Sequence, residues 1–165
     1  MNDLIRNLIE ALREELKQYG EMLALLDHQQ ELVMHRRTNE LLESVSTVNG
    51  QSEIIQVTRR EREQRQREIA QQFNVDDDAT FAILIPLLPS DYRPLVGALV
   101  QENNELLIRV QQRARQNHLL LSRAVDLMQR FINTLSPTPP TTTYNDIGRV
   151  AGDAVVHTSL FQAVG

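Results

Sequence analysis

The sequence contains no cysteine and no tryptophan among its 165 residues. Without cysteine, disulfide bonds, thiolate catalysis and cysteine-based metal sites are excluded. Aromatic residues make up only 4% of the chain, which argues against a compact globule built around large rings. The six glycines and six prolines are too few for an all-β fold rich in turns.

The chain also lacks an excess of positive charge and a long apolar run. Its net charge is −5 and its isoelectric point is near 5.4, which disfavours nonspecific nucleic-acid binding as its main activity. The N-terminus lacks the basic flank and apolar stretch of a secretory signal, and no later run is long and apolar enough to span a bilayer. We therefore expect a cytoplasmic protein without membrane insertion.

Leucine dominates the 41% of residues that are hydrophobic, and charged residues make up 24%. This composition is typical of long helices packed along their lengths. Apolar residues recur at spacings of three and four, which predicts helices at about residues 4–36, 39–73 and 91–135 and a short helical turn at about 79–85. We expect a turn near Arg37 between the first two helices, although a single continuous helix is the competing possibility.

These elements predict an all-α fold. We expect an elongated antiparallel three-helix bundle or coiled coil over residues 1–135, followed by a disordered, flexible tail over residues 136–165 that is rich in proline and threonine. The third helix is expected to match the first two in length. Its early apolar residues would cover the start of the first helix, and its end would lie near the turn; these early residues are Leu95, Val96, Leu99 and Leu106.

Two adjacent apolar stripes occur near the end of the third predicted helix. The first stripe continues the phase of the helix and consists of Leu120, Ala124, Leu127 and Phe131. The second consists of Leu121, Val125, Met128 and Ile132. One stripe is enough for a bundle, so the second indicates an intermolecular interface. The alternatives are burial by segment 81–88 or by the tail, and a homodimer.

We find no catalytic constellation, no cofactor motif and no metal site. His28 and His35 are two helical turns apart, too far to ligate one metal together. The chain is therefore not expected to be an enzyme.

Arginines are concentrated in the second predicted helix, where glutamates are interleaved with them. The arginines are Arg59, Arg60, Arg62, Arg65 and Arg67, and the glutamates are Glu61, Glu63 and Glu68. A solvated face with ion pairs along the helix is the favoured interpretation. Arg59 and Arg62 could instead reach carboxylates on a neighbouring helix. Nucleic-acid binding through this run is the third hypothesis.

The chain resembles the FlgN family of flagellar type III export chaperones. The resemblance covers most of the chain, and its more specific parts are the segment Gln-Asn-His-Leu-Leu-Leu at 116–121 and the segment Thr-Thr-Tyr-Asn-Asp-Ile-Gly at 142–148. It implies a cytoplasmic chaperone that holds the C-terminal helical segment of hook-associated proteins of the FlgK and FlgL type. It also implies delivery of these clients to the cytoplasmic domain of an FlhA-type export gate.

The resemblance further implies which residues contact these partners. The client-binding residues would be Asn117, Leu120, Leu121, Ala124, Leu127, Met128 and Phe131, and Tyr144 would contact the export gate. A lone aromatic residue in a flexible arm is a typical anchor for short-motif recognition. The alternative function is a structural coiled-coil protein that self-associates through the same face and has no client.

Overall fold

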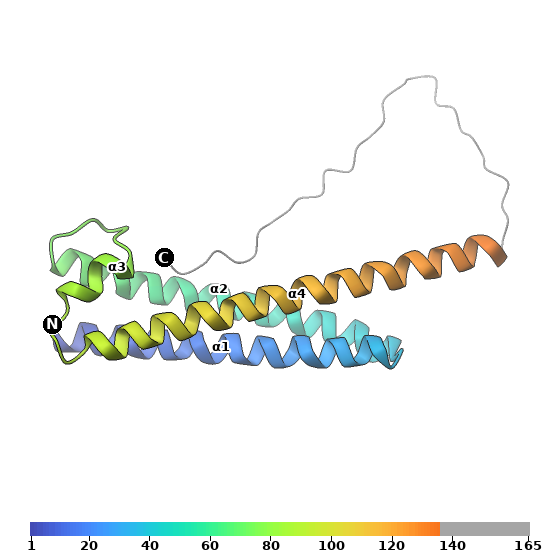
Figure 1. The fold of residues 1–165 in the computed structure, drawn as a ribbon, viewed down its shortest axis with the longest axis horizontal. Helices are drawn as coiled ribbons and strands as arrows, with labels where there is room; N and C mark the ends of the chain where they lie inside the picture. Colours follow the sequence, from blue (N-terminus) through green and yellow to red (C-terminus); the bar gives the residue numbers. More distant parts are fainter. Residues whose placement is uncertain (136–165) are drawn as a thin grey trace, which may run out of the picture.

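The computed structural model describes residues 1–135, which form three long helices and a short helical connection (Figure 1). The long helices are α1 (Asn2–Met34), α2 (Thr38–Gln72) and α4 (Arg93–Leu135). The connection contains α3 (Phe81–Leu84) and the 3-10 helix η1 (Ile85–Leu87). No strand occurs in this part of the chain, so the predicted all-α fold of long packed helices is confirmed. The tail predicted at residues 136–165 lies outside the described residues.

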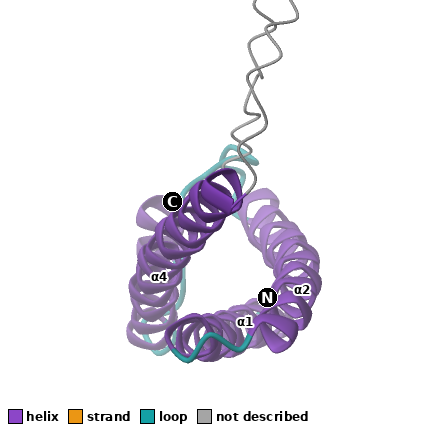
Figure 2. Ribbon diagram, turned by 90° about the vertical axis from the view of Figure 1, so that its right-hand side faces the viewer, coloured by secondary structure: helices purple, strands orange, loops and turns teal. Residues whose placement is uncertain are grey.

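The helix α1 is the central element of the bundle. Viewed end-on in Figure 2, the three long helices occupy the corners of a triangle. The helix α1 packs along both α2 and α4, and these contacts far exceed those between α2 and α4. The positions of α2 and α4 are therefore set mainly by what each contacts on α1.

The turn between α1 and α2 is formed without glycine. Arg36 has a left-handed backbone with φ of 55°, and the backbone N–H of Arg37 donates to the carbonyl of Leu32 at 3.0 Å. This bond and the one from Arg36 N–H to Val33 O, at 3.2 Å, form the pattern that commonly ends a helix. The chain therefore reverses at residues 35–37, and the alternative of one continuous helix is wrong.

The connection after α2 closes the end of the bundle where α1 begins. Phe81, Leu84 and Leu88 are buried there against Ile5 and Leu8 of α1. The alternative in which segment 81–88 covers the end of α4 is therefore wrong, because this segment lies at the opposite end of the bundle (Figure 1).

The start of α4 packs on this end of the bundle in a slightly different phase from the predicted one. Val96 and Leu99 are buried as expected, but Leu95 is exposed. Farther along α4, Leu107 is fully buried, whereas Leu106 is only half-buried. The physical reason is that the seam of α4 faces α1 and α2 together, which shifts the buried stripe by one residue at this level.

A buried ion pair joins α1 to α2 in the middle of the bundle. The Nε atom of Arg62 lies 3.0 Å from Oε2 of Glu15, and both side chains are buried. The hydroxyl of Tyr19 donates to the other oxygen of Glu15 at 2.9 Å, and burial together with this carboxylate raises the pKa of Tyr19. The predicted possibility that Arg62 reaches a carboxylate on a neighbouring helix is thus confirmed, whereas Arg59 pairs within α2 with Glu63 at 3.0 Å.

Two buried asparagines fix α4 against α1. The side-chain amide of Asn103 donates to the carbonyl of Leu12 at 3.0 Å, and that of Asn117 donates to the carbonyl of Leu26 at 2.7 Å. Both pairs are separated by 91 residues, so the two helices run parallel in a constant register. This register places Met34, the last residue of α1, level with position 125 of α4.

The third long helix is longer than its neighbours, contrary to the expectation of equal lengths. It has 43 residues, whereas α1 has 33 and α2 has 35. In the register set by the asparagines, residues 126–135 extend beyond the α1–α2 turn by about 15 Å at a rise of about 1.5 Å per residue. Figure 1 shows this end of α4 projecting past the turn.

We predict that removing one partner of the buried ion pair destabilises the bundle. Arg62→Met leaves the Glu15 carboxylate buried without its cation, which should lower the free energy of unfolding by about 3–5 kcal/mol. Urea unfolding followed by circular dichroism measures this change. Arg65→Met is the matched control, because Arg65 pairs with Glu68 at the surface of the same helix and its loss should change stability far less. Equal effects of the two substitutions would contradict the prediction.

Candidate binding face at the end of α4

The last part of α4, residues 118–135, carries most of the exposed apolar surface of this helix, and we call it the terminal segment. Its large apolar side chains are between 50 and 67% exposed at seven positions. These are Leu119, Val125, Leu127, Met128, Phe131, Ile132 and Leu135. Apolar side chains gathered on one helix in this way mark a site of interaction, because isolated patches of such size seldom remain uncovered.

The structure separates the predicted client-binding residues into three groups. Ala124, Leu127, Met128 and Phe131 are exposed on the terminal segment, and Leu120 and Leu121 are half-buried. Asn117 is buried, and its amide donates to α1 at the Leu26 carbonyl and at Oε1 of Gln29, the latter at 3.1 Å. Four of the seven predicted residues are thus open to a partner, two lie at the border, and Asn117 fixes α4 to α1.

Both apolar stripes continue from the seam of the bundle at helical spacing. Asn117 follows the buried residue Val110 at a spacing of seven. It is followed at a spacing of three by Leu120 of the first stripe and at a spacing of four by Leu121 of the second, and both leucines are half-buried. Burial therefore does not assign the seam to one stripe at this end of the helix, and the assignment of the first stripe to the bundle stays a prediction. Because α1 ends and α2 begins near the level of Val125, both stripes are without cover beyond that level.

Four of the exposed residues were not among the predicted contact residues, and one of them, Leu119, belongs to neither stripe. Val125 and Ile132 were recognised as part of the second stripe, and Leu135 extends the same phase by three residues to the end of the helix. The spacing of three and four was the signal that could have added them. The exposed face therefore reaches to the last residue of α4.

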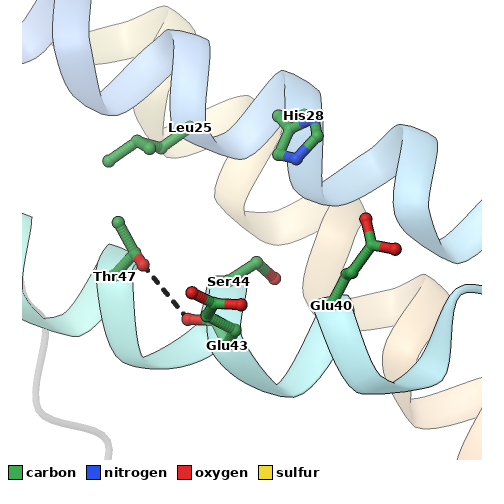
Figure 3. Close-up of a pocket in the computed structure, with 6 residues that line it drawn as sticks. All are labelled: Leu25, His28, Glu40, Glu43, Ser44 and Thr47. Atoms are coloured by element: carbon green, nitrogen blue, oxygen red, sulfur yellow. Dashed lines mark hydrogen bonds between the residues drawn. The ribbon is translucent and has the colours of Figure 1, made fainter.

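A shallow pocket of about 250 Å³ lies elsewhere, on the outer side of the α1–α2 pair (Figure 3). It is lined by Leu25 and His28 of α1 and by Glu40, Glu43, Ser44 and Thr47 of α2. The hydroxyl of Thr47 donates to the backbone carbonyl of Glu43 at 3.1 Å, so this group is already engaged within α2. The pocket does not include any predicted site residue.

The metal-site, membrane and arginine-run hypotheses from the sequence can each be compared with the structure. In residues 1–135, no three histidine, aspartate or glutamate side chains are grouped to hold a metal ion. None of the described helices combines the length and hydropathy needed to cross a bilayer. Arg65 pairs with Glu68 at 3.1 Å, one of the ion pairs expected along the arginine run, and these contacts lower the pKa of Glu68. Tyr144 lies outside the described residues.

A comparison with protein-family models finds one that matches most of the chain. The family is described as FlgN protein, and its model matches residues 1–152. The match therefore includes all three long helices and part of the sequence that follows α4. No curated protein and no solved structure matches the chain.

We predict that the terminal segment of α4 is the least protected part of this helix. Its backbone hydrogen bonds are not supported by tertiary packing, so the amides of residues 126–135 should exchange with solvent at least about a hundredfold faster than those of residues 96–117. Hydrogen exchange followed by mass spectrometry measures this difference. Uniform protection as far as Leu135 would show that the segment is covered in the free protein.

Proposed function

The chain belongs to the FlgN protein family, and on this premise we propose that it binds the C-terminal helical segment of hook-associated flagellar proteins and delivers them to the export gate. FlgN proteins are flagellar export chaperones and bind flagellar proteins, and the family is not an enzyme family. The proposed clients are of the FlgK and FlgL type, the proposed gate component is the cytoplasmic domain of an FlhA-type protein, and the proposed location is the cytoplasm.

The observation that carries this proposal is the exposed apolar face of the terminal segment. A hook-associated protein before assembly carries amphipathic terminal helices that are meant to pack against neighbours in a tube. Such helices would expose apolar surface and associate prematurely. An apolar helix face such as that of Leu127, Met128 and Phe131 can cover the apolar side of a partner helix in the manner of helix-groove recognition.

The polar side of the same segment supports a one-sided contact. Arg123, Asp126 and Arg130 are exposed, and helical spacing places them together on the side away from the apolar stripes. A client held on the apolar side leaves these charges in water, where they keep the complex soluble. Release requires no nucleotide site under this proposal, because a partner of moderate affinity can be displaced by competition at the gate.

We predict that two charges on the exposed face abolish client binding without unfolding the chaperone. Leu127→Asp with Phe131→Asp should weaken binding of a peptide from the C-terminal segment of a hook-associated protein at least about a hundredfold, because two apolar contacts are replaced by carboxylates that would have to be desolvated. Both positions are exposed, so the helical circular dichroism signal should be unchanged. Isothermal titration calorimetry measures the affinity.

The matched control for this pair is Leu42→Asp. Leu42 is 69% exposed on α2, about as much as Leu127 at 67%, but it does not belong to the terminal segment. Client binding should be retained in this variant. Unchanged binding in the double variant, with native helicity, would show that the assigned face is wrong. A stable dimer that persists in excess peptide and excludes it would instead support the structural coiled-coil alternative.

For the export gate we propose Tyr144 as the contacting residue. Its aromatic ring can serve as an anchor for a small interface. We predict that Tyr144→Ala weakens binding of the gate cytoplasmic domain at least about tenfold and leaves the affinity for the client peptide unchanged. Titration of the variant with each partner separately measures both affinities. Loss of client binding instead would place Tyr144 in the client contact.

A further inference from the structure

One flank of α4 changes its chemistry where α1 comes to an end. Arg113 marks this flank as facing α1, because its Nε lies 2.6 Å from Oδ1 of Asp27. Earlier in α4 the same flank carries both polar and apolar residues at helical spacing, namely Leu95, Glu102, Leu106 and Arg109. Later it carries three apolar residues at spacings of seven, seven and four, namely Leu120, Leu127 and Phe131. The flank is thus mixed in character along most of α1 and wholly apolar from Leu120 onward, which lies level with Gln29 near the end of α1.

The apolar surface of the terminal segment is centred on the direction of α1. Together, the two apolar stripes cover an arc of about 160° around α4 at about 100° per residue. The middle of this arc has the same orientation as Asn117, which donates to α1, and as Leu135 at the end of the helix. A helix that covers the arc therefore lies on the line of α1, beyond Met34.

The end of α1 presents cationic side chains to such a helix. The carbonyls of Glu31, Leu32 and Val33 already accept backbone hydrogen bonds from residues 35–37, so they are not free to receive the amino end of another helix. The cationic residues at this end are Arg36 and Arg37, both exposed. Arg37 pairs with Glu40 at 2.6 Å, whereas the ion pairs of residues 1–135 do not include Arg36.

The backbone of Arg36 adds a second observation. Its φ of 55° is a conformation in which glycine is usual and a larger residue is disfavoured. The arginine therefore does not improve the turn, and its charge is available to a ligand. A helix carries partial negative charge at its carboxyl end, which is stabilised by a nearby cation.

From these observations we propose that the client helix continues the line of α1 along the terminal segment and runs antiparallel to α4, with its carboxyl end at Arg36. This inference rests on the proposed function and specifies the partner as an amphipathic helix with an acidic carboxyl end. The apolar arc fixes its line, and the cationic end of α1 fixes its direction.

A second copy of the chain fits this surface less well. If two terminal segments paired in the same way, the end that meets Arg36 would be Leu135, where the chain continues and therefore has no terminal carboxylate. The paired segment carries two arginines, Arg123 and Arg130, and one aspartate, Asp126. The net charge of these three residues therefore has the same sign as the charge of Arg36. Charge complementarity therefore favours a client with acidic groups over a copy of this chain.

The absence of cysteine allows a direct test of this geometry with the full chain. A spin label is attached to Met34→Cys at the end of α1 or to Thr134→Cys at the end of α4, both at exposed positions. Each labelled protein is mixed with the isotope-labelled client peptide, whose binding to the unlabelled protein is measured first. The label at position 34 should broaden resonances at the carboxyl end of the peptide, and the label at position 134 those at its amino end.

The outcomes separate this inference from the proposed function. A peptide that binds but shows the reverse pattern, or equal broadening from both labels, overturns the inference and leaves the client function intact. A peptide that does not bind overturns both. In a control, the isotope-labelled molecule is a second copy of the chain. If its resonances are broadened and the peptide cannot displace it, the copy occupies the surface, which also overturns the inference.

The charge of Arg36 is tested by substitution. Arg36→Gly suits the turn and removes the cation, so it should weaken peptide binding by about two- to fivefold at low ionic strength, whereas Arg36→Lys should retain it. Arg60→Gln is the control, because it removes an exposed arginine of α2 away from this end of α1. Equal affinities of the Arg36→Gly and wild-type proteins would overturn the assigned direction.

Discussion

The register between α1 and α4 is the constraint on which the remaining structure depends. Helices joined only by evenly spaced apolar residues can slide by a heptad with little change in buried surface, whereas a displaced buried amide loses its acceptor. Asn103 and Asn117 are buried in the seam, and both donate to carbonyls of α1 that are 91 residues away. A slip of one heptad would move α4 by about 10 Å and change how much of its apolar end is covered. The two asparagines thus determine that the terminal segment extends past the turn.

The all-α fold could be predicted from the sequence because helical spacing is a local property of the chain. The assignment of stripes could not, because both Leu120 and Leu121 follow Asn117 at a helical spacing and both are followed by further apolar residues. Asn117, which donates to α1, lies between the two stripes, and the first residue of each stripe is half-buried. The predicted bounds already made the third helix longer than the other two, but which of its residues lie beyond the turn could not be predicted, since local spacing does not define which residues lie side by side.

Buried polar residues are the other part of the bundle that sequence patterns miss. On α2 these include Gln51 and Arg62, positions that a pattern of apolar residues assigns to solvent. Gln51 donates to Oε1 of Gln18 at 2.7 Å, and Arg62 pairs with Glu15, so each is buried with a partner from α1. A polar residue can be recognised as buried only when its partner is known, and the partner is distant in sequence. The helix α2 is therefore aligned with α1 by specific polar contacts as well as by apolar packing.

The division of the molecule into a bundle fixed by polar contacts and an exposed terminal segment gives the proposed chaperone function a physical basis. The polar contacts fix the three helices of the bundle relative to one another. The terminal segment leaves its apolar side open and needs no rearrangement to meet a client. None of the binding energy is therefore used to open the bundle. A single helix with its backbone hydrogen bonds satisfied also lacks the unpaired edge through which exposed strands aggregate. A client that contacted one side of one helix would bury a surface limited by the length of that segment. Such a contact can be strong enough to cover an apolar client and still weak enough for the client to leave.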